Sequence, residues 1–333
     1  MNAKTFIATA GHGLIRSTRQ ADGQWLVELL LTDHEVRCLA ADPLDSSVLY
    51  VGTQGKGVLR SGDRGDTWQP AGLAGKIVKS IAVSRAEPGV VYAGTKPPMV
   101  FVSRDHGTTW TELAAFRRIR SRAFWFSPAE PPGTAYVQSI ALSPTDPAII
   151  LAGIEFGAVV RSVDGGKTWM DHRPGALRDC HSLMFHPTDG NWVYEGGGSG
   201  GGVAVSQDAG KTWQQPKGGL DRHYGWAVAA DPAQPEVWYA SLSSGAMKAH
   251  SAGNAQAHIF RSAGNSHWRR LSGGLPQPLN EMPYALCIDP SAPGHVYAGL
   301  SSGDVWHSPD HGETWRKLPF SLTGIHRALI VLS

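Results

Sequence analysis

Five segments of the chain share the pattern S-x-D-x-G-x-T-W: "SGDRGDTW" (61–68), "SRDHGTTW" (103–110), "SVDGGKTW" (162–169), "SQDAGKTW" (206–213) and "SPDHGETW" (308–315). Two degenerate copies, "RSTRQADGQW" ending at Trp25 and "RSAGNSHW" ending at Trp268, keep the Arg-Ser pair and the tryptophan. Asp and Gly favour a tight turn whose amides bond the carboxylate, and the indole offers a large apolar surface for burial. The motif therefore predicts one structural turn repeated seven times. The residues assigned to it are Asp63, Asp105, Asp164, Asp208, Asp310, Trp68, Trp110, Trp169, Trp213 and Trp315.

A four-strand unit recurs around each copy. Its first strand has the pattern of "VRCLAADP" (36–43) or "VQSIALSP" (137–144), and its second the pattern of "VLYVGT" (48–53). The seven tryptophans are spaced 42 to 59 residues apart, and the two longest intervals indicate insertions at about 116–136 and 243–260. Short strands at this period predict an all-β, seven-bladed β-propeller of four-stranded antiparallel blades.

The two ends of the chain complete each other. Residues 5–31 supply three strands, and the apolar "HRALIVLS" (326–333) supplies the missing innermost one, which would otherwise be an exposed edge. We therefore expect a single domain over 1–333, closed by the C-terminal strand joining the N-terminal blade. Its blades are expected at 5–31 plus 326–333, and at about 36–72, 78–116, 137–173, 180–217, 225–272 and 283–319.

Composition narrows the function classes. Hydrophobic residues make up 41% of 333 positions, and the net charge of +2 is too balanced for a general nucleic-acid or membrane-surface binder. The start "MNAKTFIATAGHG" lacks the features of a secretory signal, so we expect a cytoplasmic location, and a monomer. Cys38, Cys180 and Cys287 form no metal-ligand spacing and are expected to be small buried residues.

The repeated motif resembles the Asp-box of bacterial-neuraminidase-repeat (BNR) proteins, the sialidase-like and sortilin-like propellers, along essentially the whole chain. The resemblance implies the fold and a structural role for the turns, which lie away from the chemistry in those families. It also implies candidate functions: the superfamily includes sialidases and xyloglucan-degrading glycosidases. The layout is closer to seven-bladed proteins such as the photosystem II assembly factors than to a true sialidase, since sialidases have six blades and an Arg-Ile-Pro motif, whereas this chain has seven repeats and lacks that motif.

One repeated position is expected at the channel mouth of the propeller. It is the second residue of each first strand, and its occupants are polar, basic or aromatic: Arg37, Lys79, Gln138, His181, Trp226, Tyr284 and Arg327. Large hydrogen-bonding residues among small aliphatic ones predict a pocket lining, with solvated strand ends as the alternative.

Glu195 breaks the second-strand pattern, because six blades carry Ala or Val at its position. Burial there would raise the pKa of the carboxyl into the range of a general acid, and antiparallel pairing brings it near His181. We therefore predict Glu195 and His181 as an acid and base. The following "GGGSGGG" (196–202) leaves room for a ligand or for close backbone approach; a salt-bridged Glu beside a flexible loop is the alternative.

Loops add further candidates. Arg118 and Arg120 of the insertion "FRRIRSRAFWF" (116–126) are suited to an anionic ligand, although a solvated basic flap explains them equally. His223, Tyr224 and Glu155 are also expected at the mouth. Several loop histidines could approach it, but no ligand spacing supports a metal, so neither metal nor cofactor is predicted.

Two functions remain open. The first is binding of a small anionic or sugar-like ligand, with glycosidase-like hydrolase or lyase chemistry at Glu195 and His181. The second is a non-catalytic scaffold with a protein partner, resembling the photosystem II assembly factors.

Overall fold

The computed structural model describes residues 4–129, 131–216, 218–264 and 267–332. It is all-β, and its seven sheets correspond to the seven sequence repeats, so the predicted seven-bladed β-propeller is confirmed. The chain divides into two compact units. Unit 1 comprises Met1–Val36, Gly198–Val203 and Pro216–Ser333, and unit 2 comprises Arg37–Gly197 and Ala204–Gln215. The single domain stays a prediction.

Unit 1 contains blades 1, 6 and 7, each with four strands. Blade 1 has β26 (Leu329–Leu332), β1 (Thr5–Thr9), β2 (Leu14–Arg19) and β3 (Trp25–Leu30). Blade 6 has β18 (Tyr224–Ala230), β19 (Val237–Ser243), β20 (His258–Ala263) and β21 (Trp268–Leu271). Blade 7 has β22 (Pro283–Ile288), β23 (Val296–Leu300), β24 (Asp304–Ser308) and β25 (Arg316–Ser321).

Most residues of the other four blades belong to unit 2. Blade 2 has β4 (Val36–Ala41), β5 (Leu49–Thr53), β6 (Val58–Ser61) and β7 (Gln69–Pro70). Blade 3 has β8 (Ile77–Val83), β9 (Val91–Lys96), β10 (Val100–Ser103) and β11 (Thr111–Glu112). Blade 4 has β12 (Val137–Leu142), β13 (Ile150–Ile154) and β14 (Val159–Ser162); blade 5 has β15 (Cys180–Phe185), β16 (Val193–Gly197) and β17 (Val203–Ser206). In these two blades the fourth strand is reduced to single bridges, Arg161 with Met170 and Val205 with Gln214.

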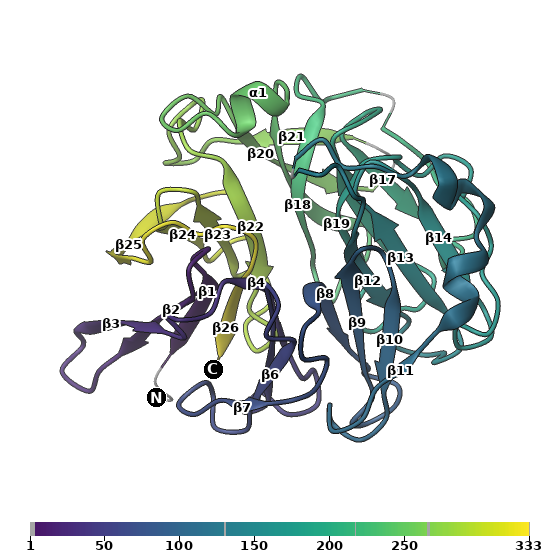
Figure 1. Ribbon diagram of the computed structural model, residues 1–333. Helices are drawn as coiled ribbons and strands as arrows, with labels where there is room; N and C mark the ends of the chain where they lie inside the picture. Colours follow the sequence, from purple (N-terminus) through teal and green to yellow (C-terminus); the bar gives the residue numbers. More distant parts are fainter. Residues whose placement is uncertain (1–3, 130, 217, 265–266, 333) are drawn as a thin grey trace. The chain divides into compact units, whose positions relative to one another are not determined.

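The last described strand belongs to the first blade, as predicted. Strand β26 pairs antiparallel with β1, from Thr5 opposite Leu332 to Ala8 opposite Leu329 (Figure 1). The strand begins at Leu329, later than the sequence indicated, because Arg327 turns onto Thr9 instead: its N–H donates to the Thr9 hydroxyl at 3.1 Å. Ser333 lies outside the described residues. Although β26 is far from β1 in the sequence, this pairing buries three of its apolar residues in unit 1: Leu329, Val331 and Leu332.

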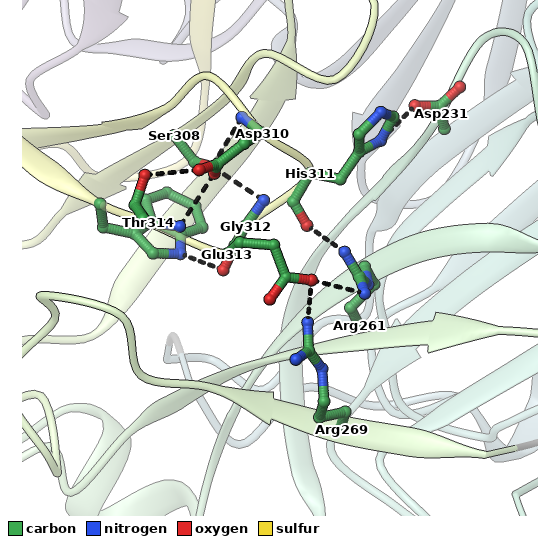
Figure 2. A network of polar contacts seen from close by, with 10 residues as sticks. Asp231, Arg261, Arg269, Ser308, Asp310, His311, Gly312, Glu313 and Thr314 are labelled. Carbon is green, nitrogen blue, oxygen red and sulfur yellow. Dashed lines mark hydrogen bonds and ion pairs between the residues drawn. The ribbon is translucent and has the colours of Figure 1, made fainter.

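Each intact S-x-D-x-G-x-T-W segment forms the same hydrogen-bonded turn. In the copy of Figure 2, Asp310 Oδ1 accepts from the Ser308 hydroxyl and the Thr314 amide, each at 2.8 Å, and its Oδ2 accepts from the Thr314 hydroxyl at 2.6 Å. The Gly312 amide donates to Ser308 Oγ at 2.8 Å. The turn contains two left-handed residues: His311 has a φ of +56° and Gly312 a φ of +87°. Glycine adopts this conformation at no steric cost. The motif is thus a local turn held by one carboxylate.

Arginines preceding the turn serine link successive blades. Arg161 Nε donates to the carbonyl of Ala209 at 2.8 Å in unit 2, and Arg261 Nη1 donates to the carbonyl of His311 at 2.6 Å in unit 1. Ala209 and His311 are the left-handed residues of the turns in the following blades. The unusual backbone of each turn therefore presents a carbonyl that the preceding blade can bond.

Two insertions carry the described helices. The first contains the 3₁₀ helices η1 (Ala114–Arg118) and η2 (Arg120–Phe124), and the second contains α1 (Ala246–Ala249). Phe116 of η1 is 1% exposed and contacts Trp169 edge to face at 5.1 Å, which anchors the first insertion on blade 4. In the described part of the chain no helix has the length and apolar character needed to cross a bilayer. Cys180 is buried, whereas Cys38 and Cys287 are partly exposed; all three are free thiols.

Candidate functional site

The repeated mouth position coincides with a β-bulge in five blades. Register shifts between first and second strands fall at Lys79, Gln138 and His181 in unit 2, and at Trp226 and Tyr284 in unit 1. A bulge adds an unpaired residue and re-aims its side chain. The sequence pattern of large polar residues at this position therefore reflects a local break in strand pairing.

In unit 2, two carboxylates and an imidazole from different segments meet. Glu155 follows β13, Asp179 precedes β15, and His181 is the bulged residue of β15. One ligand-type atom of each lies within 4.8 Å of those of the others, and His181 Nε2 is 3.4 Å from Asp179 Oδ2. All three residues are 5–7% exposed. We call Glu155, Asp179 and His181 the acidic-histidine cluster.

Glycine and Glu195 hold the segment that carries Asp179. A Cβ on Gly197 would lie 2.2 Å from the Asp179 carbonyl oxygen, so only glycine allows the loop to approach the strand. Glu195 is fully buried, and its Oε2 accepts from the Leu177 amide at 2.9 Å. Of the two uses predicted for the glycine run, Gly197 thus fits close backbone approach.

Burial raises the pKa of Glu195 well above its ordinary value; hydrogen bonding from Leu177 and Cys180 opposes this shift and the Asp179 carboxylate adds to it. The Cys180 thiol lies beside these groups. Burial, and then the negative charges of Glu195, Asp179 and Glu155, raise the pKa of Cys180 well above its ordinary value. Three carboxyl groups therefore surround one buried thiol next to the cluster.

Exposed aromatic rings adjoin the cluster. Phe156 follows Glu155 directly, has the left-handed φ of +46°, and donates its N–H to Asp179 Oδ1 at 3.2 Å. Its ring is 42% exposed and lies 4.8 Å from the ring of Phe126, which is 48% exposed. A bulky residue in this backbone region is strained, and such strain concentrates at functional sites. We call Phe126 and Phe156 the phenylalanine pair.

Two lysines and a glutamine lie in the same region of unit 2 as the acidic-histidine cluster. Gln138 Nε2 donates to the carbonyl of His181 at 3.3 Å. Lys79, 1% exposed, has its Nζ 4.5 Å from the centre of the Tyr136 ring, and Lys96 Nζ lies 5.8 Å from the same ring. The Tyr136 carbonyl in turn accepts from the Glu155 amide at 3.2 Å. Three of the predicted mouth residues, Lys79, Gln138 and His181, thus belong to one region of unit 2.

The arginines of the first insertion are divided between two roles. Arg117 pairs with Glu112, and Arg122 donates to the Pro98 carbonyl, so these two hold the insertion on blade 3. Arg118 and Arg120 are exposed. These two remain the insertion's candidates for an anionic ligand.

A separate aromatic group forms in unit 1. His250 Nε2 lies 2.9 Å from the hydroxyl oxygen of Tyr224, and its Nδ1 lies 2.6 Å from that of Tyr284. The Trp226 ring contacts His250 and Tyr284 at 5.2 Å and 5.0 Å. Burial, with a contribution from Glu281, raises the pKa of Tyr284 to about 12. Trp226, Tyr284 and Tyr224 are therefore brought together, whereas His223 is exposed, and Arg37 and Arg327 are partly exposed in different units.

Sequence reasoning missed three contributors: Asp179 as a partner of His181, Phe156, and His250. The first two come from loops of neighbouring blades, and the third comes from an insertion. A local signal was the bulky Phe156 in the turn after β13, where blade 2 has "QGKG" (54–57) and blade 7 has "SSG" (301–303).

No protein-family model matches the chain. A curated relative, a probable oligoxyloglucan-reducing end-specific xyloglucanase of Neosartorya fischeri, is 25% identical over 183 residues, which is 49% of this chain and 21% of that protein. The chain thus spans about a fifth of that relative.

Solved structures share the fold. The GH74 xyloglucanase of Xanthomonas campestris aligns at a TM-score of 0.70 and 20% identity, over 93% of this chain and 52% of that one. An ancestral GH74 enzyme aligns at a TM-score of 0.65 and 21% identity, over 84% and 38%. YCF48 bound to D1 peptide aligns at a TM-score of 0.57 and 17% identity, over 85% and 80%. These alignments show a common propeller fold.

Proposed function

We propose that this chain binds a small sugar-like ligand in unit 2, over the phenylalanine pair and against the acidic-histidine cluster. The single observation that carries the proposal is the Phe156 turn. It places an exposed, paired ring one residue after Glu155, and its amide bonds Asp179.

The two parts suit the two sides of a sugar. An apolar ring face is a platform for the C–H groups of a pyranose, and buried carboxylates and an imidazole accept and donate hydrogen bonds to its hydroxyls. Ligand sites generally combine aromatic walls with a few convergent polar groups. The GH74 neighbours act on xyloglucan by name, which supports a carbohydrate as the ligand class. We also assign the repeated turns to the Asp-box that the sequence motif resembles.

Hydrolase or lyase chemistry is the finer part of the proposal. His181 is positioned by Asp179 to take or give a proton. Glu195 is fully buried and bonds Leu177, so we assign it the positioning of the Asp179 segment instead of proton transfer to a ligand. Activity on aryl glycosides, lost in His181→Gln and retained in His223→Gln, tests this chemistry separately from binding.

The binding test compares four variants by calorimetric titration with xylogluco-oligosaccharides, neutral monosaccharides and uronic acids. Phe126→Ala and Asp179→Asn should weaken binding of the sugar that the parent chain binds. Phe124→Ala is the matched control, because Phe124 is 82% exposed in the same insertion, and Glu236→Gln controls for loss of an exposed carboxylate. Equal binding by all four variants would contradict the proposal.

A scaffold role is the second candidate. The chain covers 80% of YCF48, a larger share than it covers of the xyloglucanases, and that structure contains a bound peptide. Capture of peptides by the chain, with no response to any sugar, would favour this reading.

A further inference from the structure

The acidic-histidine cluster has the composition of a metal site. Two carboxylates and one imidazole offer ligand atoms within 4.8 Å of one another. Carboxylate oxygens and imidazole nitrogens together suit borderline divalent ions such as Zn²⁺ and Mn²⁺. Magnesium and calcium prefer oxygen ligands alone.

One edge of the required geometry is already present. At metal–ligand distances of about 2.0–2.1 Å, tetrahedral ligands are about 3.3 Å apart. His181 Nε2 and Asp179 Oδ2 are 3.4 Å apart. The Phe156 amide holds the Asp179 side chain at Oδ1, and Gln138 holds the His181 backbone at its carbonyl. The ligand-type atom of Glu155 lies within 4.8 Å of both.

Glu195 gives an independent indication. Glu195 and Gly197 lie on the same face of β16, and Gly197 is paired with Cys180. The carboxyl group of Glu195 accepts a hydrogen bond from the Leu177 amide, in the segment that carries Asp179. Its Oε2 is bonded there, but Oε1 is buried without a nitrogen or oxygen donor among the described residues. The Cys180 thiol beside Glu195 is a weak donor, so a stronger partner would further stabilise this fully buried carboxyl group. A metal ion with its bound water provides such a partner.

We propose that Glu155, Asp179 and His181 bind one divalent cation, Zn²⁺ or Mn²⁺, with Glu195 as a supporting outer residue. The inference rests on the proposed function in one respect, since the same cluster faces the ligand. It also removes a conflict: two carboxylates repel an anionic ligand, whereas a cation on them attracts uronic-acid carboxylates and sugar hydroxyls.

The test uses the full chain after treatment with EDTA, titrated with ZnCl₂, MnCl₂, CaCl₂ and MgCl₂ by calorimetry and by thermal unfolding. We expect one equivalent of Zn²⁺ or Mn²⁺ to bind and raise Tm, with no comparable response to CaCl₂ or MgCl₂. Asp179→Asn and Glu155→Gln should abolish this response. Glu195→Gln should weaken it by about 10- to 100-fold.

Matched controls separate the cluster from other metal-binding groups. His223→Gln and His12→Gln remove exposed histidines, and Cys180→Ser removes the adjacent thiol; all three should bind Zn²⁺ as the parent does. When Co²⁺ replaces Zn²⁺, the chain should show the visible absorption bands that are typical of Co²⁺ in a low-symmetry site. These bands should be absent in His181→Gln. Loss of zinc binding in Cys180→Ser instead would assign the metal to the thiol and overturn the proposal.

Two outcomes distinguish this inference from the proposed function. Sugar binding that persists in EDTA, with no response to either metal, would overturn the cation site and leave the proposed function intact. In that case the buried lysines Lys79 and Lys96 supply the positive charge, and Lys79→Met should abolish sugar binding. Metal binding without any sugar binding would confirm the cation site and contradict the proposed sugar binding.

Discussion

The guanidinium of Arg261 in blade 6 donates to the carbonyl of His311 at 2.6 Å, inside the turn of blade 7 (Figure 2). The same guanidinium lies 2.9 Å from Glu313, which also contacts Arg269. One turn therefore receives two arginines from the preceding blade, and only one of them bonds the turn backbone.

This difference predicts unequal effects on stability. Arg261→Met should lower the free energy of unfolding by about 1.5–3 kcal/mol, because a charge-assisted bond to the backbone is lost. Arg269→Met should cost less than about 1 kcal/mol, since its side chain is 53% exposed and only an ion pair is removed. Urea unfolding of the two variants measures the difference. Equal losses of stability would mean that the ion pairs with Glu313, which both arginines form, contribute more than the hydrogen bond to the His311 carbonyl.

The carboxylates of the repeated turns predict an acid sensitivity. Hydrogen bonds from the Thr67 hydroxyl and amide, and then from Ser61, lower the pKa of Asp63 to about 2 from its ordinary value of 3.8. A lowered folded-state pKa contributes stability above pH 3.8 that is lost as the pH falls toward 2. Thr67→Val should reduce stability at pH 6 and flatten the loss between pH 4 and pH 2. Thr32→Val, in an exposed loop, is the control, and an unchanged acid profile in Thr67→Val would contradict this origin.

The closing strand predicts a defined loss on truncation. Leu329, Val331 and Leu332 are each at most 9% exposed, and each contributes roughly 1.5–3 kcal/mol of burial. Ending the chain after Ile325 should therefore broaden the urea transition and lower its midpoint. Adding the peptide "HRALIVLS" in trans should restore the midpoint, whereas a scrambled peptide should not. A truncated chain that unfolds like the parent would refute closure through β26.

The strain at Phe156 predicts a trade between stability and ligand binding. Its φ of +46° costs a residue with a side chain of order 1 kcal/mol or more, and glycine avoids this cost. Phe156→Gly should leave Tm unchanged or raise it while sugar binding is lost. Gly75→Ala, at a glycine of φ +80° with open space around it, is the converse control and should lower Tm slightly. A large loss of Tm in Phe156→Gly would mean that the ring is structural.

The parts of the structure that repeat were predictable from the sequence, and the parts that break the repeat were only partly so. The turn residues and the tryptophan period gave the blades, and the odd strand at the C-terminus gave β26. The repeated position of Lys79, Gln138 and His181 was visible in the sequence, and its place at a channel mouth stays a prediction. The β-bulge found there was not predictable, because a bulge has no pattern of its own in one sequence.

The cluster itself depends on two loops whose approach no periodicity describes. Asp179 meets Glu155 and His181 only because Gly197 admits its backbone and Phe156 turns left-handed to bond it. The glycine run indicated close approach as one of two uses, without naming the residue that approaches. Glu195 was identified as an exception to the repeat, yet its hydrogen bond to Leu177 reflects tertiary structure alone.

Glu195 finally predicts a pH-dependent stability difference, measured in EDTA. Its folded-state pKa is raised above the ordinary value of 4.5, so the folded state binds more protons than the unfolded state above pH 4.5. The stability contributed by the neutral carboxyl is complete below pH 4.5 and declines as the pH rises through the folded pKa. Glu195→Gln keeps an oxygen for the Leu177 amide and has no proton to lose. The variant should therefore match the parent near pH 4.5 and become progressively more stable than the parent toward pH 8.

Glu195→Ala loses the hydrogen bond and leaves a cavity, so it should be less stable than the parent at every pH. Urea unfolding of the three chains from pH 4.5 to pH 8 gives both comparisons. A constant difference between Glu195→Gln and the parent would show that the carboxyl is ionised within the fold, and its negative charge would then be compensated there.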